Sequence, residues 1–201
     1  TASIFGIKLE IKDIDFLAIM EKMRRRIGED IEAIRNSLAD DPYLDYYHES
    51  AEFISPYTLK VGEKTLHSDM IFLCTGSKPS IPPIKGLEEA GYLTSDTMLK
   101  LKECPKKLAI LGGSFIAAEY GHFFSAMGAS VTVIGRNFQF LQQEEPEISR
   151  LASMKMSEYM QIITNHEAIE VQKEDNGQKT VVARDRTSGK EVKVTVDEIL
   201  V

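Results

Sequence analysis

Apolar residues recur with a helical period near the start of the chain. From residue 14 to residue 38 the steps between them are three or four positions, which places them on one face of a helix. These residues are Phe16, Met20, Met23, Ile27, Ile31, Ile34 and Leu38. Two aspartates and Pro42 follow and end the pattern. The sequence therefore predicts one long amphipathic helix.

The pattern shortens after residue 43, where brief runs alternate with turn residues. Pro56, Gly62 and Glu63 separate these runs, as turns separate strands. The expected strands are YLDYYHE, AEFIS, YTLKV, KTLHS and DMIFLC. The last one contains MIFLC, residues 70–74, which is apolar on both faces. Such a run is typical of a strand buried in the interior of a sheet.

A connector and then an alternation of strand and helix follow. Residues 75–91 hold three prolines and several small residues, so we divide the chain into domains 1–80 and 81–201. The elements expected next are a helix at 95–101, a strand at 107–111, a helix at 114–127, a strand at 130–134, a helix from Pro146 to about 160, three or four strands between 168 and 196 with hairpin turns at Asn176–Gly177 and Ser188–Gly189, and a strand at 197–201. This order predicts an α/β fold, a Rossmann-type domain with an antiparallel β-meander.

Composition narrows the class of protein. The 201 residues are 43% hydrophobic and 27% charged, which is typical of a soluble globular chain. No apolar run approaches the roughly 20 residues of a membrane helix, and residues 1–13 lack the pattern of a signal peptide. The net charge of −7 argues against nucleic acid as the main partner. Cys74 and Cys104 fit no metal or redox motif, and the four histidines are scattered, so we expect reduced thiols, a cytoplasmic location and no metal site.

The stretch GGSFIA, residues 112–117, follows an apolar strand and opens a helix. Dinucleotide-binding turns have this outline: one glycine allows the sharp turn, a second lets the backbone approach the pyrophosphate, and a third lets helix and strand pack closely. Gly112 takes the first position, whereas Ser114 and Ala117 stand at the other two. The phosphates would lie on the helix N-terminus, where free N–H groups favour anions. A plain strand–turn–helix corner is the alternative.

The end of the next strand bears on which nucleotide is bound. NAD sites usually carry a carboxylate there to hold the ribose hydroxyls. This chain has Gly135 at that position and Arg136 after it. An arginine without a neighbouring carboxylate suits the 2′-phosphate of NADP. The alternative is a surface arginine in a turn.

Two residues of the helix after the turn are candidates for a role in the chemistry. Glu119 lies among mostly apolar positions, so it either faces solvent or pairs with a buried cation, because unpaired burial of a charge is costly. Phe115 is either a core residue or an aromatic ring at the mouth of the nucleotide site. The sequence alone leaves both alternatives open.

Longer stretches resemble a known family. DMIFLCTGSKPSIPPIKG resembles the ATGS-x-P-x-x-P-x-I-x-G stretch of the flavoprotein disulfide reductases, which include dihydrolipoamide dehydrogenase, glutathione reductase, mycothione reductase and mercuric reductase. The following segment, from TSDTMLKL to GASVTVI, is similar to the entry into their NAD(P) domain. The resemblance covers about residues 43–201. VTVIGRN and FLQQEEPEIS are most similar to the mercuric and mycothione reductase branches, although such sequences are commonly called dihydrolipoamide dehydrogenase.

The resemblance implies a homodimeric FAD enzyme in which NAD(P)H passes a hydride to flavin, and flavin exchanges electrons with a dithiol that reduces a disulfide substrate. It implies that NADP-using members also carry alanine at the third glycine. Glu119 matches the glutamate that pairs with a lysine beside the flavin, and Phe115 matches the aromatic gate of the nicotinamide pocket. Matching positions for NAD(P) binding are Gly112, Gly113, Ser114, Phe115, Ile116, Ala117, Gly135 and Arg136. Those for FAD binding are Ser50, Ala51, Thr75 and Gly76.

Departures from the family pattern limit these expectations. The FAD fingerprint, the C-x4-C dithiol and the C-terminal dimerisation domain have no counterpart in these residues. Gln142 stands where NADP-using relatives often have a second arginine. We therefore expect an excised piece, part of an FAD-binding domain (1–80) followed by the NAD(P)-binding domain (81–201), that is inactive alone. A non-catalytic Rossmann-like binding module is the rival interpretation.

Overall fold

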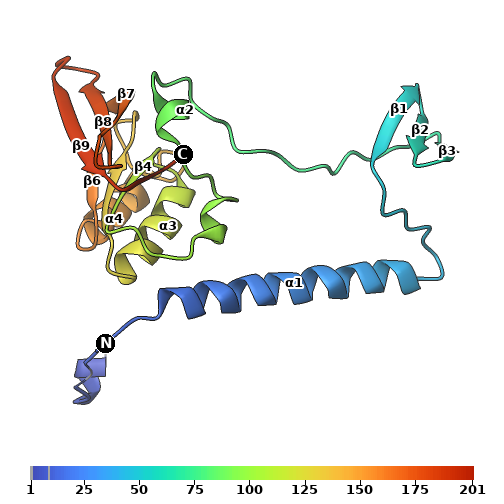
Figure 1. The fold of residues 1–201 in the computed structure, drawn as a ribbon, viewed down its shortest axis with the longest axis horizontal. Coiled ribbons are helices and arrows are strands. Elements are labelled where there is room, and N and C mark those ends of the chain that lie inside the picture. The colour runs from blue at the N-terminus through green and yellow to red at the C-terminus, as the bar shows by residue number, and fades with distance from the viewer. Residues whose placement is uncertain (1, 9) are drawn as a thin grey trace. The chain divides into compact units, whose positions relative to one another are not determined.

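The computed structural model describes residues 2–8 and 10–201. The chain divides into two compact units, one formed by Lys22–Lys78 and the other by Pro79–Val201 together with residues up to Glu21. In Figure 1 the strands of the first unit are cyan, and those of the second run from yellow-green to red. Each unit has sheets of its own.

The long helix forms as the apolar period predicts. Helix α1 spans Phe16–Asp40 and follows a short 3-10 helix, η1, at Ala2–Phe5. Only the first turns of its apolar face are buried, at Phe16 and Met20. The ring of Phe16 lies 6.3 and 6.2 Å from the rings of Phe123 and Phe124, measured between centroids. Farther along, the apolar stripe at Ile27, Ile31 and Ile34 is exposed.

The smaller unit contains one antiparallel sheet. Its strands are β1 (Ala51–Ser55), β2 (Thr58–Val61) and β3 (Lys64–His67), in that spatial order. Gly62 makes the β2–β3 turn at φ 58°, a conformation that favours glycine. A β-carbon there would also collide with the Glu49 carboxylate. These three strands confirm the middle three of the five expected in this region.

Two expected strands do not form. Residues 43–49 have no strand geometry, and neither do residues 70–74, where Phe72 and Leu73 are exposed. A strand inside a sheet needs neighbours on both sides to pair its N–H and C=O groups. No strand of the described residues pairs with either segment. The prediction of a buried strand at MIFLC is therefore wrong for this chain.

The larger unit is built on a parallel sheet with the order β10-β4-β5-β6. The strands are β4 (Lys107–Leu111), β5 (Ser130–Ile134), β6 (Gln161–Ile163) and β10 (Glu198–Leu200). Helix α3 (Phe115–Ala126) connects β4 to β5, and α4 (Pro146–Met156) lies between β5 and β6. Both connections step across the sheet in the same direction, so right-handed crossovers place both helices on one face (Figure 1).

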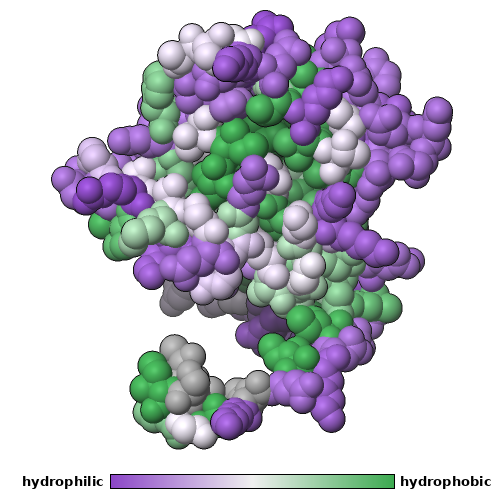
Figure 2. All heavy atoms as spheres, turned by 90° about the vertical axis from the view of Figure 1, so that its left-hand side faces the viewer, coloured by the Kyte–Doolittle hydropathy of each residue, from purple (hydrophilic) through white to green (hydrophobic). Residues whose placement is uncertain are grey.

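An antiparallel meander follows β6, as predicted. It consists of β7 (His166–Lys173), β8 (Lys179–Asp185) and β9 (Glu191–Val196), and Gly177 and Gly189 take positive φ in its two hairpin turns. Outward residues of β9, such as Glu191 and Lys193, are exposed. Figure 2 views the molecule from the side of the meander and shows polar residues around an apolar patch on that face.

The parallel sheet is buried on both faces. A cluster between this sheet, the meander and the short helix α2 (Leu87–Ala90) contains Leu87, Ala90, Ala109, Ile134, Val171, Val181, Ala183, Val196 and Ile199. On the other face, Ala117 and Phe124 of α3 are buried. Each large apolar side chain buried in this way contributes about 1.5–3 kcal/mol. The mixed fold with parallel and antiparallel sheets confirms the predicted α/β class.

Two helix boundaries differ from prediction. In place of a helix at 95–101 there is a single 3-10 turn, η2 (Met98–Lys100). Thr94 and Thr97 exchange hydrogen bonds between side chains and backbone before it, the reciprocal pattern of a helix N-terminus, but the turn that follows ends at Lys100. Helix α4 ends at Met156, short of the expected residue 160, because Met160 is buried as the chain enters β6.

Both cysteine thiols are free, and burial raises the pKa of Cys104. Among the described residues, no helix is long and apolar enough to cross a membrane. Within the same residues, no group of three histidine, cysteine or acidic side chains could hold a metal ion.

Candidate nucleotide site

The glycine turn lies at the carboxyl end of β4, the edge at which open α/β sheets bind ligands. Gly112 takes φ 125° and donates its N–H to the Ile134 carbonyl at 2.9 Å. A β-carbon added to Gly112 would meet nothing within 4 Å. The positive φ thus accounts for glycine at this position, and the space in front of its backbone is open to a ligand.

Gly113 and Gly135 bring two loops into contact. A β-carbon on Gly135 would lie 3.6 Å from the Cα and N atoms of Gly113, which is ordinary van der Waals contact. The Gly113 carbonyl also accepts the Leu141 N–H at 2.7 Å. The sequence suggested that Gly135 marks a missing carboxylate. The structure adds that the end of β5 lies against the turn after β4.

Helix α3 begins with donors that are free to bind an anion. Its N-cap is Ser114, in extended conformation, whose side chain makes no capping hydrogen bond. The first N–H groups of a helix have no intrahelical acceptor, and they carry the positive end of the helix dipole. The turn therefore offers backbone donors at the place where a pyrophosphate would bind.

Helix α3 makes a further close contact one turn after Ala117. Ala117 is buried, and at Gly121 a β-carbon would lie 2.8 Å from the Met160 sulfur and 3.6 Å from Ile110 Cδ1. Sequence reasoning missed Gly121. Its signal was a glycine four residues after Ala117, on the same helix face.

Two cavities flank the turn and share Gly112 and Arg136. One, of about 300 Å³, is also lined by Gly113, Ser114, Phe115, Asn137 and residues 141–144. The other, of about 340 Å³, is also lined by residues 82–84, Leu111, Ile134 and residues 166–168. Five of the eight residues expected to bind NAD(P) thus line these cavities. Gly135 packs against Gly113 without lining either cavity, Ala117 is buried, and Ile116 lines neither cavity.

Sequence reasoning missed the connector prolines and the start of the meander. Pro82 and Pro83 precede a hydrogen bond between Lys85 and Val171, which joins the connector to β7. His166 is held from both sides: its N–H donates to the Gly135 carbonyl at 3.0 Å, and its Nδ1 lies 2.7 Å from the Thr164 carbonyl. Pro82 belongs to the stretch that resembles the family, but nothing in the sequence assigned it to the turn, and no local motif marks His166.

Arg136 is exposed and lines both cavities. In residues 2–8 and 10–201, no carboxylate lies within ion-pair distance of its guanidinium. Glu144 lines the first cavity and Glu167 the second. Arg136 is therefore a cation at the end of β5, available to an anionic group of a ligand.

Phe115 and Glu119 both lie on the outer side of α3. Phe115 is 60% exposed and lines the first cavity, so the structure supports the mouth of the site and excludes the core alternative. Glu119 is exposed, and within the described part of the chain it has no ion-pair partner. Burial, and then the nearby Glu119 charge, raise the pKa of Tyr120.

The residues matched to FAD binding do not form a site. Ser50, Ala51, Thr75 and Gly76 belong to the smaller unit, and all four are exposed. They line neither of the cavities described above. Among the described residues, these four therefore do not form an FAD site on their own.

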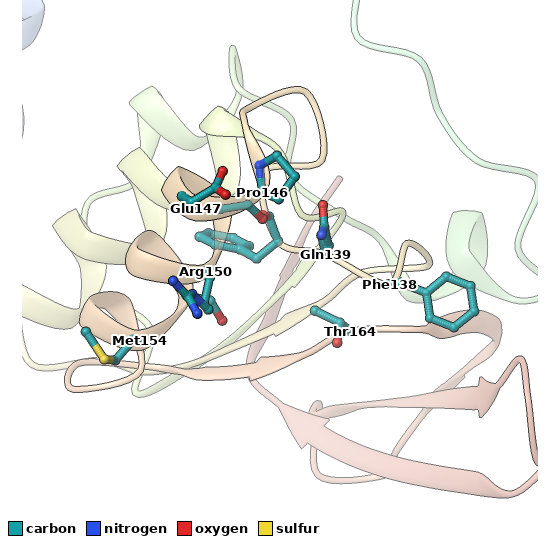
Figure 3. A pocket seen from close by; sticks show the side chains of 10 residues that line it. Phe138, Gln139, Pro146, Glu147, Arg150, Met154 and Thr164 are labelled. Atoms are coloured by element: carbon teal, nitrogen blue, oxygen red, sulfur yellow. The ribbon is translucent and has the colours of Figure 1, made fainter.

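A larger cavity, of about 640 Å³, lies behind the loop after β5. Phe138 and Gln139 line it from the loop, while Glu147, Arg150 and Met154 line it from α4 (Figure 3). It contains none of the residues expected from sequence to bind a nucleotide. The buried Ser149 hydroxyl on its wall is already bonded to the Phe140 carbonyl. Size alone therefore does not make this cavity the nucleotide site.

Comparisons with known proteins agree on the family. The model of the pyridine nucleotide-disulphide oxidoreductase family matches residues 10–201. A mercuric reductase of Staphylococcus aureus is 31% identical over 179 residues, which cover 80% of this chain and 33% of that protein. The probable pyridine nucleotide-disulfide oxidoreductase RclA of Escherichia coli K12 is 34% identical over 151 residues, covering 70% of this chain and 34% of RclA.

The solved structures lead to the same group. The HOCl-induced flavoprotein disulfide reductase RclA from Escherichia coli matches with a TM-score of 0.80 and 28% identity, covering 94% of this chain and 42% of that structure. The chain spans about a third of the length of the curated relatives named above. The resemblance found in the sequence is confirmed: this chain belongs to the pyridine nucleotide-disulphide oxidoreductase family.

Proposed function

We propose that this chain supplies the NAD(P)-binding site of an FAD-dependent dithiol/disulfide oxidoreductase. One observation carries the proposal: Gly112 and Arg136 line both cavities, and the N-terminus of α3 lines the first of them. Backbone donors suit a pyrophosphate, and an arginine suits a further phosphate. The contribution of the chain is to bind and orient the nucleotide.

We further propose that NADP is preferred over NAD. Gly135 provides no carboxylate for the ribose hydroxyls, and Arg136 has no ion-pair partner among the described residues. Gln142 lines the same cavity as Arg136 and adds hydrogen-bonding groups without charge. The 2′-phosphate is the part of NADP that NAD lacks, so a single cation at this place changes the preference.

The parent protein, in this proposal, is a cytoplasmic homodimer related to dihydrolipoamide dehydrogenase. A mercuric or mycothione reductase is the second candidate, which the mercuric reductases among the relatives favour. Phe115 would stand at the nicotinamide end of the site, and Glu119 would take part beside the flavin, as the family pattern implies. Ser50, Ala51, Thr75 and Gly76 would complete an FAD site with residues beyond those described.

The test is a calorimetric titration of the 201-residue chain with NADPH and with NADH. We expect NADPH to bind more tightly, and Arg136→Ala to remove most of that difference, about tenfold if the arginine–phosphate contact resembles other charged hydrogen bonds. Arg184→Ala is the matched control, because Arg184 lies on β8, pairs with Glu191 and lines neither cavity. Absence of binding of both nucleotides at millimolar concentration contradicts the proposal.

A further inference from the structure

A second arginine reaches the end of β5 from the meander. Arg186 lies in the hairpin between β8 and β9, and its Nη1 donates to the Arg136 carbonyl at 3.0 Å. The two arginines are 50 residues apart in sequence, and the fold brings them together. Arg186 lines neither cavity, but its guanidinium contacts the backbone of the residue that would meet the ribose 2′ position.

The backbone around Arg186 is held firmly. Its N–H donates to the Asn165 carbonyl at 2.9 Å, and the Asn165 N–H donates to the Asn137 carbonyl at 2.7 Å. These bonds join the β8–β9 hairpin to the loop after β5 through the corner before β7. Two backbone hydrogen bonds thus hold the Arg186 backbone near the loop that carries Arg136, and the Nη1 bond of the side chain adds a third.

The charge of Arg186 is available to a ligand. A guanidinium carries five N–H donors, and the Arg136 carbonyl uses one of them. In the part of the chain that the structure describes, no carboxylate lies within ion-pair distance of Arg186. The adjacent Asp185 is occupied: hydrogen bonds from the backbone of Ser188 and Thr187 lower its pKa, and His166 Nε2 lies 3.9 Å away.

A second cation near Arg136 would offset the negative charge beside the two cavities. Glu144 and Glu167 line the cavities beside Arg136, and their negative charge opposes the binding of a phosphate. Gln142 cannot offset them, because it is neutral. A phosphate dianion is held best by more than one guanidinium, each of which can donate two parallel hydrogen bonds.

We propose that Arg186 is the second cationic residue of the 2′-phosphate site and a determinant of the preference for NADP over NAD. This inference rests on the proposed nucleotide-binding function, and it names a residue of that site that comes from the meander. Arg136 and Arg186 then hold the phosphate from two loops, and Arg186 supplies the charge that Gln142 does not.

The experiment compares NADPH and NADH binding to the full chain by calorimetry for the wild type, Arg186→Gln and Arg186→Lys. Glutamine keeps a donor for the Arg136 carbonyl but removes the charge, whereas lysine keeps the charge. We expect Arg186→Gln to weaken NADPH binding about fivefold and leave NADH binding unchanged, in line with a partly exposed ion pair. Arg186→Lys should retain most of the NADPH affinity.

Two further readouts separate charge from structure. Arg184→Gln, which removes a neighbouring charge of β8 that pairs with Glu191, should change neither affinity. The salt dependence of NADPH binding should become shallower in Arg186→Gln, because one screened interaction is lost. Nuclear magnetic resonance spectra of each variant show whether the fold is kept.

Each outcome decides the matter. An equal loss of NADPH and NADH affinity in Arg186→Gln overturns the proposal and leaves Arg186 a structural support of the loop. Unchanged NADPH affinity in that variant overturns it as well. A wild type that binds both nucleotides equally overturns the inference while nucleotide binding stands, and a wild type that binds neither overturns both.

Discussion

Two similar apolar runs, one in each unit of the chain, differ in structure: one forms a buried strand and the other does not. KLAIL becomes β4, which is buried between β10 and β5 in the larger unit. MIFLC, in the smaller unit, is exposed and forms no strand. Both runs are apolar on both faces, so the difference lies in the neighbours. Side-chain burial and backbone hydrogen bonding both require neighbouring strands. An apolar run therefore forms a strand only where adjacent strands can pair with it.

The largest effect expected from this comparison is in the core. Ile199→Ala removes a side chain that is 0% exposed and lies between the parallel sheet and the meander. It should lower the free energy of unfolding of the larger unit by about 2–5 kcal/mol, since it leaves a cavity. Hydrogen exchange of the β4 and β5 amides during urea titration measures the loss.

The matched change in the smaller unit is Phe72→Ala. Phe72 is 81% exposed, so its removal should change the free energy of unfolding by less than about 0.5 kcal/mol. A loss comparable to that of Ile199→Ala would show that residues 70–74 are buried in solution, and the contrast between the units would then fail.

A smaller effect is expected from two glycines in helices. Gly121→Val in α3 forces a side chain against Met160 and Ile110, where even a β-carbon lies 2.8 Å from sulfur. It should cost about 1–3 kcal/mol of unfolding free energy through overpacking. Gly28→Val in α1 meets nothing within 4 Å and should stay within about 0.5 kcal/mol of the wild type. Equal effects at both positions would contradict the close packing assigned to Gly121.

The smallest effect expected is a pH dependence of the larger unit. The side chain of Gln178, followed by backbone N–H groups of Lys107 and Lys106, lowers the pKa of Asp197. A lowered folded-state pKa stabilises the fold above the unfolded value, and this contribution is lost as pH falls through the folded value. Unfolding free energy of the larger unit should therefore decline below about pH 4.

The control for this decline lies in the same meander. Asp197→Asn should flatten the acid loss, whereas Asp175→Asn should not, because Asp175 is exposed and none of the hydrogen bonds found in the described residues involves its side chain. Urea denaturation between pH 3 and pH 6 measures both. A decline of the same size in Asp197→Asn and the wild type would show that other groups cause it.

Much of the larger unit could be predicted because its signals are local. The strands at 107–111 and 130–134, the helix after Ser114 and both glycine hairpins follow from apolar period and turn chemistry. Helix α4 was expected too long, since the apolar pattern continues to Met160, where the side chain packs beneath Gly121. The smaller unit was predicted less well. Its apolar run at residues 70–74 indicates a buried strand, but no other residues of the unit cover or pair with that run.

The candidate site was predicted only in part, because only some of its residues belong to a local sequence pattern. Gly112, Ser114 and Arg136 belong to a motif that can be read along the chain. Pro82 and His166 line the second cavity, and in our proposal Arg186 lies close by. His166 and Arg186 reach the turn because β6 leads into the meander beside β5, and Pro82 reaches it because the connector pairs with β7 at Lys85 and Glu170.

The sequence by itself determined the family, the α/β class and the strand–turn–helix at Gly112. These follow from short-range patterns, in which each residue is constrained by neighbours a few positions away. The tertiary structure decided that Met160 packs against α3 at Gly121, that MIFLC is exposed, and that Arg186 lies beside Arg136. Contacts between residues far apart in sequence depend on which strands pair and how loops fold back, and no local pattern contains that information.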